Sequence, residues 1–175
     1  MSDSNWYMLT LVGKDRSGIV ARITQALFVA GGHLGEARMM RLGCNFGVLL
    51  MVQFPGQVAD LERVMQSEAD ALGLRLHVDA IDPGLHQHVL ADVAVTVYGA
   101  DRPGIVAQVA GALAEAGLNI TDLQTQVGGT EQKPIYGLQL EGVAQNGIEV
   151  LEQAMQTLKA EGIEVRVQPI DVLIG

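Results

Sequence analysis

The sequence predicts an α+β protein that consists of two similar small domains, each with the element order β-α-β-β-α-β. The first observation behind this prediction is a repeated turn: Gly-Lys-Asp-Arg-Ser-Gly-Ile-Val at 13–20 recurs as Gly-Ala-Asp-Arg-Pro-Gly-Ile-Val at 99–106. The second is the length of the repeat, because an ungapped comparison of 13–31 with 99–117 gives identity at eleven of nineteen positions. Each copy also stands between an apolar run and a helical pattern. A repeat of this kind indicates duplication of one supersecondary unit.

The composition is that of a globular chain with enough apolar side chains for buried cores, since 49% of the residues are hydrophobic and 18% are charged. No apolar run approaches the roughly 20 residues that a membrane-spanning helix needs. The N-terminal residues 1–5 lack the basic and apolar parts of a secretion signal. We therefore expect a cytoplasmic protein without a membrane partner.

Acidic residues gather in the second half of the chain. Residues 1–87 carry nine acids and seven bases, whereas 88–175 carry eleven acids and four bases. Direct binding to nucleic acid depends on lysine and arginine side chains that neutralise phosphates, and the sequence shows no basic stripe or aromatic stacking surface. We expect no direct contact with nucleic acid, so any effect on gene expression would pass through another protein.

The first strand and the first helix are predicted at 6–12 and 17–31. Residues 6–12 form a short apolar run, which Gly13 ends where the backbone must turn. Ser17 is the predicted N-cap of the helix, and the pair Gly31-Gly32 stops it. The helical period places five residues on the predicted buried face: Ile19, Val20, Ile23, Leu27 and Ala30.

The next two elements are strands at 33–42 and 46–54, joined as a hairpin by the turn at 43–45. Apolar and polar residues alternate only loosely in the first of these strands, so the pattern predicts the strand without saying which face is buried. Pro55-Gly56 ends the second strand, because proline and glycine interrupt regular pairing.

The first half closes with a helix at 57–72 and a strand at 74–80. Apolar residues recur in the helix with a helical period, and they alternate with polar ones in the strand, as is typical of a half-buried strand. The residues predicted to face inward are Val58, Leu61, Met65 and Leu72 in the helix, and Leu74, Leu76, Val78 and Ala80 in the strand.

The second half repeats this order after a linker at 83–88, which begins with Pro-Gly and shows no periodicity. The two domains are therefore predicted at 1–82 and 89–175. One difference from the first half is the hairpin tip at 128–134, which is predicted to be a longer polar loop. The predicted elements of the second half are a strand at 90–98, a helix at 103–117, strands at 119–127 and 135–141, a helix at 146–160 and a strand at 163–172.

Six elements in this order are typical of the ferredoxin-like fold, a four-stranded antiparallel sheet with two helices on one face. The predicted architecture is two such domains in tandem. The opposite face of each sheet needs cover, which a second domain or another copy of the chain can provide. We therefore expect a homo-oligomer.

The repeated turn can serve as an anion site or as a structural joint. In the second copy Pro103 suits the first helical position, and Gly104 leaves room for a ligand to approach the backbone. The free N–H groups and partial positive charge of a helix N-terminus suit a carboxylate. In the alternative interpretation both turns are joints, in which Asp15 and Asp101 accept hydrogen bonds from local N–H groups. The residues alone leave both interpretations open.

The sequence offers little for catalysis or for a metal. His86 and His88 lie close together, but they stand in the predicted linker without a nearby thiol, and the single cysteine, Cys44, sits in a turn. No histidine is placed by the sequence as a base for Ser17. The repeated glycines are not followed by the lysine and hydroxyl residue of a phosphate-binding loop. We expect no catalytic residue, no metal and no cofactor.

The motif Asp-Arg-Pro-Gly-Ile-Val at 101–106, followed by Ala-Gly-Leu-Asn-Ile-Thr-Asp at 116–122, resembles the ACT domain, a regulatory module that commonly senses amino acids. The ferredoxin-like order described above is the ACT fold. Two copies fill almost the whole chain, with no catalytic domain attached. That arrangement, with Arg-Met-Met-Arg-Leu-Gly at 38–43 followed by Phe46, is similar to the glycine cleavage system transcriptional repressor family.

The resemblance implies a ligand site between the first turn of one module and the start of the second strand, often where two modules meet. It implies that Asn119 accepts the ammonium group of an amino acid while backbone N–H groups hold the carboxylate. The first copy has Gly-His-Leu at 32–34 in place of Leu-Asn-Ile at 118–120, so the second copy is the favoured site. The implied ligand-binding residues are Asp15, Arg16, Ser17, Gly18, Ile19, Val20, His33 and Leu34 in the first copy, and Asp101, Arg102, Pro103, Gly104, Ile105, Val106, Asn119 and Ile120 in the second.

The function that the resemblance implies is that of a non-enzymatic regulator, which binds a small amino acid, with glycine favoured, and controls a partner transcription factor. Two alternatives stay open. In the first, the chain is a stand-alone ACT regulatory subunit of a metabolic enzyme. In the second, it is a ligand-free assembly module that uses its sheet edges.

Overall fold

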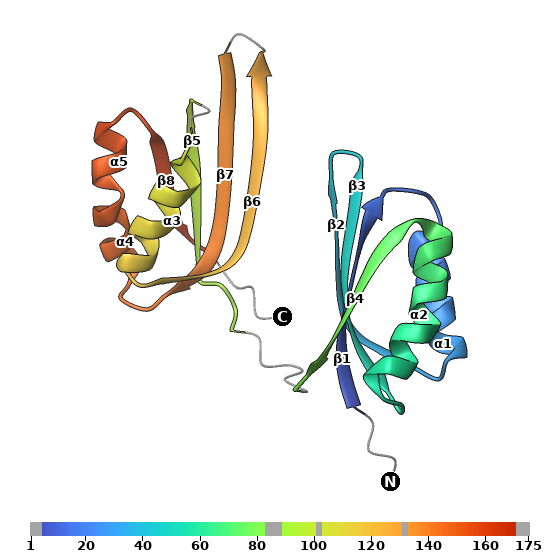
Figure 1. Ribbon diagram of the computed structural model, residues 1–175. Coiled ribbons are helices and arrows are strands. Elements are labelled where there is room, and N and C mark those ends of the chain that lie inside the picture. Colours follow the sequence, from blue (N-terminus) through green and yellow to red (C-terminus); the bar gives the residue numbers. More distant parts are fainter. Residues whose placement is uncertain (1–4, 83–88, 101–102, 131–132, 171–175) are drawn as a thin grey trace. The chain divides into compact units, whose positions relative to one another are not determined.

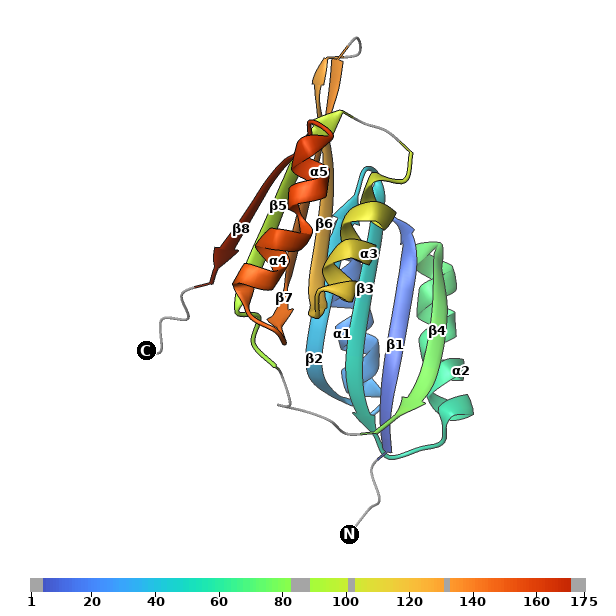
Figure 2. The ribbon, with the colours of Figure 1, turned by 90° about the vertical axis from the view of Figure 1, so that its left-hand side faces the viewer.

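The computed structural model of the protein describes residues 5–82, 89–100, 103–130 and 133–170 (Figure 1). The chain divides into two compact units, 1–87 and 88–175. Each unit contains one four-stranded antiparallel sheet, and its helices cover a single face of that sheet (Figures 1 and 2). The predicted fold class, two tandem ferredoxin-like α+β domains, is confirmed. The linker predicted at 83–88 lies outside the described residues.

The first unit has the strand order β2-β3-β1-β4, so β1 is a central strand and β2 and β4 are the edges. All three strand pairs are antiparallel. The elements are β1 (Asn5–Lys14), α1 (Ile19–Val29), β2 (His33–Leu42), β3 (Asn45–Phe54), α2 (Val58–Leu72) and β4 (Leu74–Ile81).

The second unit repeats this topology with the strand order β6-β7-β5-β8. Its second helix is broken at Met155, where the sequence predicts one continuous helix at 146–160. The elements are β5 (Val93–Ala100), α3 (Ile105–Glu115), β6 (Leu118–Thr130), β7 (Lys133–Ala144), α4 (Ile148–Ala154), α5 (Gln156–Ala160) and β8 (Glu164–Pro169). No helix in the described ranges is both long enough and apolar enough to cross a membrane.

The core of each unit lies between the helices and one face of the sheet. On β1, Tyr7, Leu9 and Leu11 are buried, whereas Met8 and Thr10 between them are partly exposed. This period of two is that of a strand with one covered face. In the second unit Val93, Val95 and Val97 of β5 occupy the matching buried positions. The repeated sequence therefore builds the same core twice.

The predicted buried face of α1 is correct except at Val20. Ile19, Ile23 and Leu27 are buried, and Ala30 packs against them from the end of the helix. Val20 is 47% exposed. The prediction for Val20 is wrong because each helical residue is turned by about 100° from the one before it, which carries Val20 off the stripe that begins at Ile19.

Neither repeated turn begins its helix at the residue that the sequence predicts. The N-cap of α1 is Gly18, not Ser17, and the helix begins at Ile19. Likewise Gly104 is the N-cap of α3, so Pro103 does not occupy the first helical position. Both glycines have the left-handed backbone conformation that side chains disfavour, and this conformation decides where the helices start.

The prediction of a polar loop at 128–134 is also wrong. Pairing between β6 and β7 continues through Gly128 with Ile135 and Gly129 with Pro134 to Thr130 with Lys133. An antiparallel ladder satisfies backbone groups whatever the side chains are, so the polar composition of the tip does not end the strands. The hairpin consequently rises beyond the rest of its sheet (Figure 1).

Gly13 lies on β1 where this strand passes close to the start of β4. A Cβ atom at Gly13 would lie 2.6 Å from Leu74 Cδ2 and 2.9 Å from the carbonyl oxygen of Gly73. At the matched position Gly99, the nearest atom to such a Cβ is Ile105 Cδ1 at 3.5 Å. The two copies therefore need glycine here to different degrees.

We predict that Gly13→Ala lowers the free energy of unfolding of the first unit by about 1–3 kcal/mol, because the new methyl group overlaps both backbone and side-chain atoms. Urea titration followed by the fluorescence of Trp6, the single tryptophan, reports on this unit. Gly99→Ala is the matched control, followed by circular dichroism, and should change stability by less than about 1 kcal/mol. Equal losses in the two variants would contradict this explanation.

Candidate ligand-binding site

The two strand-to-helix turns have the same backbone geometry at the helix start. Gly18 has φ 85° and ψ −1°, and Gly104 has φ 88° and ψ −4°. The carbonyl of Gly18 accepts a hydrogen bond from the N–H of Arg22 at 3.0 Å, and that of Gly104 accepts one from Gln108 at 2.9 Å. The repeat in sequence is thus a repeat of one helix entry.

These helix starts are open to an approaching anion. The first N–H groups of a helix lack partners within the helix and carry a partial positive charge. A glycine N-cap has no side chain with which to satisfy them, and a Cβ built on Gly18 or Gly104 would meet no atom within 4 Å among the described residues other than its chain neighbours. The first turns of α1 and α3 contain no acidic residue. A carboxylate can therefore reach the N–H groups without displacing a side chain at the glycine.

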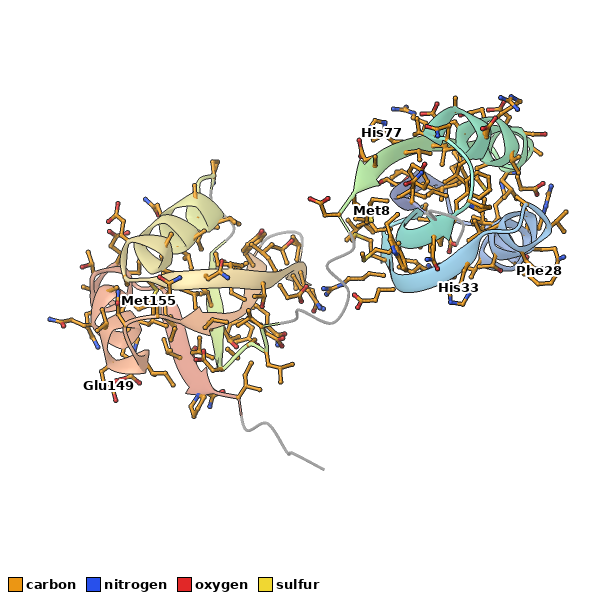
Figure 3. All side chains as sticks on the ribbon, turned by 90° about the horizontal axis from the view of Figure 1, so that it is seen from below. Met8, Phe28, His33, His77, Glu149 and Met155 are labelled. Atoms are coloured by element: carbon orange, nitrogen blue, oxygen red, sulfur yellow. The ribbon has the colours of Figure 1, made fainter. Side chains whose placement is uncertain are left out.

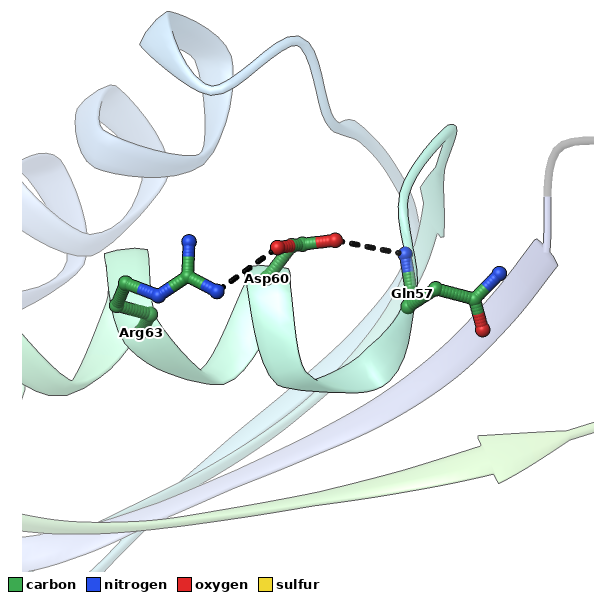
Figure 4. Close-up of polar contacts among 3 residues, drawn as sticks. All are labelled: Gln57, Asp60 and Arg63. Carbon is green, nitrogen blue, oxygen red and sulfur yellow. Dashed lines mark hydrogen bonds and ion pairs between the residues drawn. The ribbon is translucent and has the colours of Figure 1, made fainter.

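The second helix of each unit begins differently. At the start of α2 the Asp60 carboxylate accepts a hydrogen bond from the N–H of Gln57 at 3.4 Å and pairs with Arg63 at 2.9 Å (Figure 4). In the second unit Glu149 lies in the first turn of α4. Each unit therefore has an acid in the first turn of its second helix, whereas the first turns of α1 and α3 have none.

In the first unit the turn is tied to the far end of the β2–β3 hairpin. The Asp15 carboxylate forms an ion pair with Arg41, with Nε and Oδ2 2.7 Å apart, and the N–H of Asp15 donates to the carbonyl of Cys44 at 3.0 Å. The Arg16 guanidinium lies beside Gly73, at the C-terminus of α2. The carboxylate of Asp15 thus has a cation as its partner. The interpretation of this turn as a structural joint predicts local N–H groups as its partners instead.

Arg41 is absent from the residues that the sequence singles out for the site. No local signal could have identified it, because the contact joins positions that only strand pairing brings together. Asp101 and Arg102, the corresponding part of the second turn, lie outside the described residues.

The structure does not bring His33 and Leu34 to the turn of their own unit. Lys14, next to the turn, pairs with Asn45, whereas His33 pairs with Gln53, whose partner on β1 is Trp6. Trp6 and Lys14 are eight residue steps apart on β1, about 26 Å along the strand. His33 therefore lies at the opposite end of the sheet from Gly18.

The second unit separates its two segments in the same way. Ile120 pairs with Gly142 and Asn119 with Val143, level with the start of β5 at Val93. The turn to α3 follows the other end of β5, at Ala100. Within either unit, one turn and the start of the second strand cannot both contact a small molecule.

The described residues contain no group of three or more histidine, cysteine, aspartate or glutamate side chains that could hold a metal ion. What the repeated turn offers chemically is a set of backbone donors with an adjacent small residue. This arrangement can bind an anion.

Two family models match the chain, and together they cover most of it. Residues 7–79 match one model of the ACT domain, and residues 93–162 match another. The chain belongs to the ACT domain family. Its two ACT domains coincide with the two structural units, and each match includes the repeated turn. ACT domains are regulatory modules and are generally not catalytic.

Solved structures resemble this tandem ACT protein along almost its full length. A crystal structure of an unknown protein from Galdieria sulphuraria has a TM-score of 0.75 and 20% sequence identity, covering 96% of this chain and 99% of that one. A crystal structure of a candidate glycine cleavage system transcriptional repressor has a TM-score of 0.70 and 19% identity, covering 97% and 99%. At these identities the likeness shows the fold alone. No curated protein sequence gives a significant match.

The contact between the first ACT turn and β2 generates a prediction about stability. We expect Asp15→Asn and Arg41→Gln to show a coupling energy of about 0.5–1 kcal/mol in a double-mutant cycle, because their ion pair is partly exposed. Urea titration of Trp6 fluorescence measures it. The pair Asp60 and Arg63, within one helix and more exposed, is the reference and should couple by about 0.3–0.5 kcal/mol. Additive effects of the first two substitutions would show that the pair does not hold the turn.

Proposed function

We propose that this protein is a non-enzymatic amino-acid sensor, which binds a small amino acid, with glycine favoured, and controls a partner transcription factor. The observation that carries the proposal is the repeated helix entry of its ACT domains. In both domains the helix follows a left-handed glycine and has no acid in its first turn, whereas the next helix of the same domain has one there. A free amino acid provides the missing carboxylate.

In the proposed complex the backbone N–H groups at the start of a helix hold the ligand carboxylate. The turn residues would be Asp15, Arg16, Ser17, Gly18, Ile19 and Val20 in the first domain, and Asp101, Arg102, Pro103, Gly104, Ile105 and Val106 in the second. The absence of a side chain at the glycine leaves space for a compact ligand. This supports a small amino acid such as glycine.

The ligand ammonium group would be held by the start of a second strand, through the side-chain carbonyl of Asn119 next to Ile120. His33 and Leu34 occupy this place in the first domain, and an imidazole lacks the amide oxygen. We therefore favour the strand start of the second domain, with Asn119, as the better binding partner for the ammonium group. Since turn and strand start lie at opposite ends of each sheet, the two segments would come from different ACT modules.

A site assembled from two modules provides a means of regulation. The ligand stabilises one arrangement of modules, and a partner protein that prefers another arrangement is released. The two binding events are then linked by a coupling free energy that acts in both directions. The similarity in fold to a candidate glycine cleavage system transcriptional repressor supports a role in the control of transcription.

We predict that one or a few small amino acids, glycine among them, raise the melting temperature of the protein in a thermal-shift panel. A ligand at a hundred times its dissociation constant adds about 2.7 kcal/mol of stability. At least one of Gly18→Ala and Gly104→Ala should abolish the shift, because a methyl group would stand beside the N–H donors that hold the carboxylate. Gly162→Ala is the matched control, since Gly162 also has a positive φ, of 83°, with no atom within 4 Å of its Cβ position.

All three glycine variants should lose about 1–2 kcal/mol of stability from the left-handed backbone, but Gly162→Ala should keep the response to ligand. Asn119→Ala should weaken the response while keeping the fold. A panel without any stabilising amino acid would favour the ligand-free assembly module instead.

A second prediction concerns the partner. We expect the immobilised full-length chain to retain a DNA-binding regulator from a lysate of its own organism, and we expect glycine to elute that regulator while a large amino acid such as tryptophan does not. Linkage requires this elution if ligand and partner prefer different arrangements. Recovery of a metabolic enzyme in its place would identify the alternative function, a regulatory subunit of that enzyme.

A further inference from the structure

The two sheets differ on the face that their helices leave open. In the first unit this face is apolar over β1, β2 and β3, and we call it the first open face. Leu49, Met40 and Val12 on it are 38%, 43% and 48% exposed. Its apolar residues are Trp6, Met8 and Val12 on β1, Leu49 and Met51 on β3, and Met40 on β2.

The pairing registers allow a comparison with the second unit position by position, because both sheets have the same topology. At the five positions that strand pairing matches directly, the second unit has mainly polar residues. Met8, Val12, Leu49, Met51 and Met40 correspond in that order to Ala94, Tyr98, Gln139, Glu141 and Gln126. The fold therefore does not require apolar residues here, and the first open face needs another explanation.

Trp6 makes the first open face broader and smoother. A Cβ atom at Gly35 would lie 2.8 Å from Trp6 Cζ3, so the indole ring lies over the backbone of β2, two strands away from β1. Because Gly35 has no side chain, the indole ring of Trp6 can lie there. The result is a group of apolar side chains on three neighbouring strands of one face, of the kind that marks a protein interface.

The charges beside this surface suggest what covers it. Arg75, His77 and Asp79 alternate along β4 on the same face, opposite Val12, Thr10 and Met8. Arg75 and Asp79 lie about 7 Å to either side of His77 along the strand. A two-fold axis along the row of Thr10 and His77 exchanges the two ends of β4, so a cation on one copy would face an anion on the other.

We propose that the first open face is the dimer interface of this protein, where a second copy packs sheet against sheet about that two-fold axis. Arg75 then faces the partner subunit's Asp79, and Asp79 faces the partner subunit's Arg75. The matched face of the second unit has mainly polar residues at the matched positions and carries Tyr98 and Ile135 as its exposed large apolar residues, whereas a second copy supplies a face identical to the first open face. Two-fold dimers bury self-complementary patches with an apolar centre. The inference does not depend on the proposed ligand.

The same row runs through Thr10 and Leu49 and ends in His77 on β4 and Arg38 on β2, so the axis places these two residues at the edges of the sheet opposite the partner subunit's His77 and the partner subunit's Arg38. Solvent screens charges at such a rim. The apolar centre therefore supplies the affinity, and the charges of β4 mainly set the orientation of the two copies.

Sedimentation equilibrium of the full chain over a range of micromolar concentrations tests the interface. We expect a dimer, and we expect Leu49→Gln with Met51→Glu to raise its dissociation constant at least about a hundred-fold, since each change occurs twice. Both new residues are those of the matched positions in the second unit, so the fold accepts them. A monomer at all concentrations, or a dimer that survives these changes, would overturn the proposal.

Phe28→Gln is the control for loss of exposed apolar surface. Phe28 is 74% exposed on α1, on the helix side of the unit, whereas Met8 lies on the other side of the sheet (Figure 3). This variant should dimerise like the natural sequence. Melting curves by circular dichroism verify that all variants fold.

The two-fold axis itself is tested by charge reversal. Arg75→Asp and Asp79→Arg should each weaken the dimer about tenfold, because like charges then face each other twice. Together in one chain they should restore it. A mixture of the two single variants should form the heterodimer in preference to either homodimer, since every cation then faces an anion. Absence of this recovery would overturn the arrangement about the Thr10 and His77 row.

Discussion

The packing of two helices against one face of each sheet is the constraint on which the rest of the molecule depends. Leu9 and Leu11 on β1, and Val95 and Val97 on β5, are fully buried beneath these helices. Because side chains of a strand alternate between faces, this burial commits the intervening residues to the open face. The helices that cover this face, α1 and α3, each follow the end of a central strand, β1 or β5. The strand-to-helix turn at that point is the helix entry that both domains share.

The two helix entries share one backbone conformation but have different residues around them. Gly18 and Gly104 have nearly the same φ and ψ, and the first turns of the helices that they begin contain no acid. In the first domain Arg41 holds the Asp15 carboxylate, but Val127 stands at the position that corresponds to Arg41. The donors are therefore duplicated while their environment has diverged. Such divergence is expected if one copy specialises in binding and the other in assembly.

The open faces have diverged in the same direction. Replacing Leu49 and Met51 by the Gln139 and Glu141 of the second copy changes no core contact, because these residues point away from the helices. The duplication thus acts as an internal control: what both copies retain belongs to the fold, and what only one retains needs a cause outside it. The apolar residues and the charge pattern of the first open face are found in only one copy, so the fold alone does not explain them.

The sequence by itself determined the duplication, the order of the elements and most of the buried residues, because repeats, turn residues and periodicity are local properties of a chain. It also predicted the helix entry as the candidate site. It missed the glycine N-caps, where backbone conformation prevails over side-chain capping at Ser17. It missed the continued pairing of β6 and β7 past Gly128. Tertiary structure alone decided that His33 lies a whole strand length from Gly18, that Arg41 reaches Asp15, and that the apolar residues of three strands form one surface. The physical reason is that each of these relations follows from strand register, which joins residues far apart in the sequence.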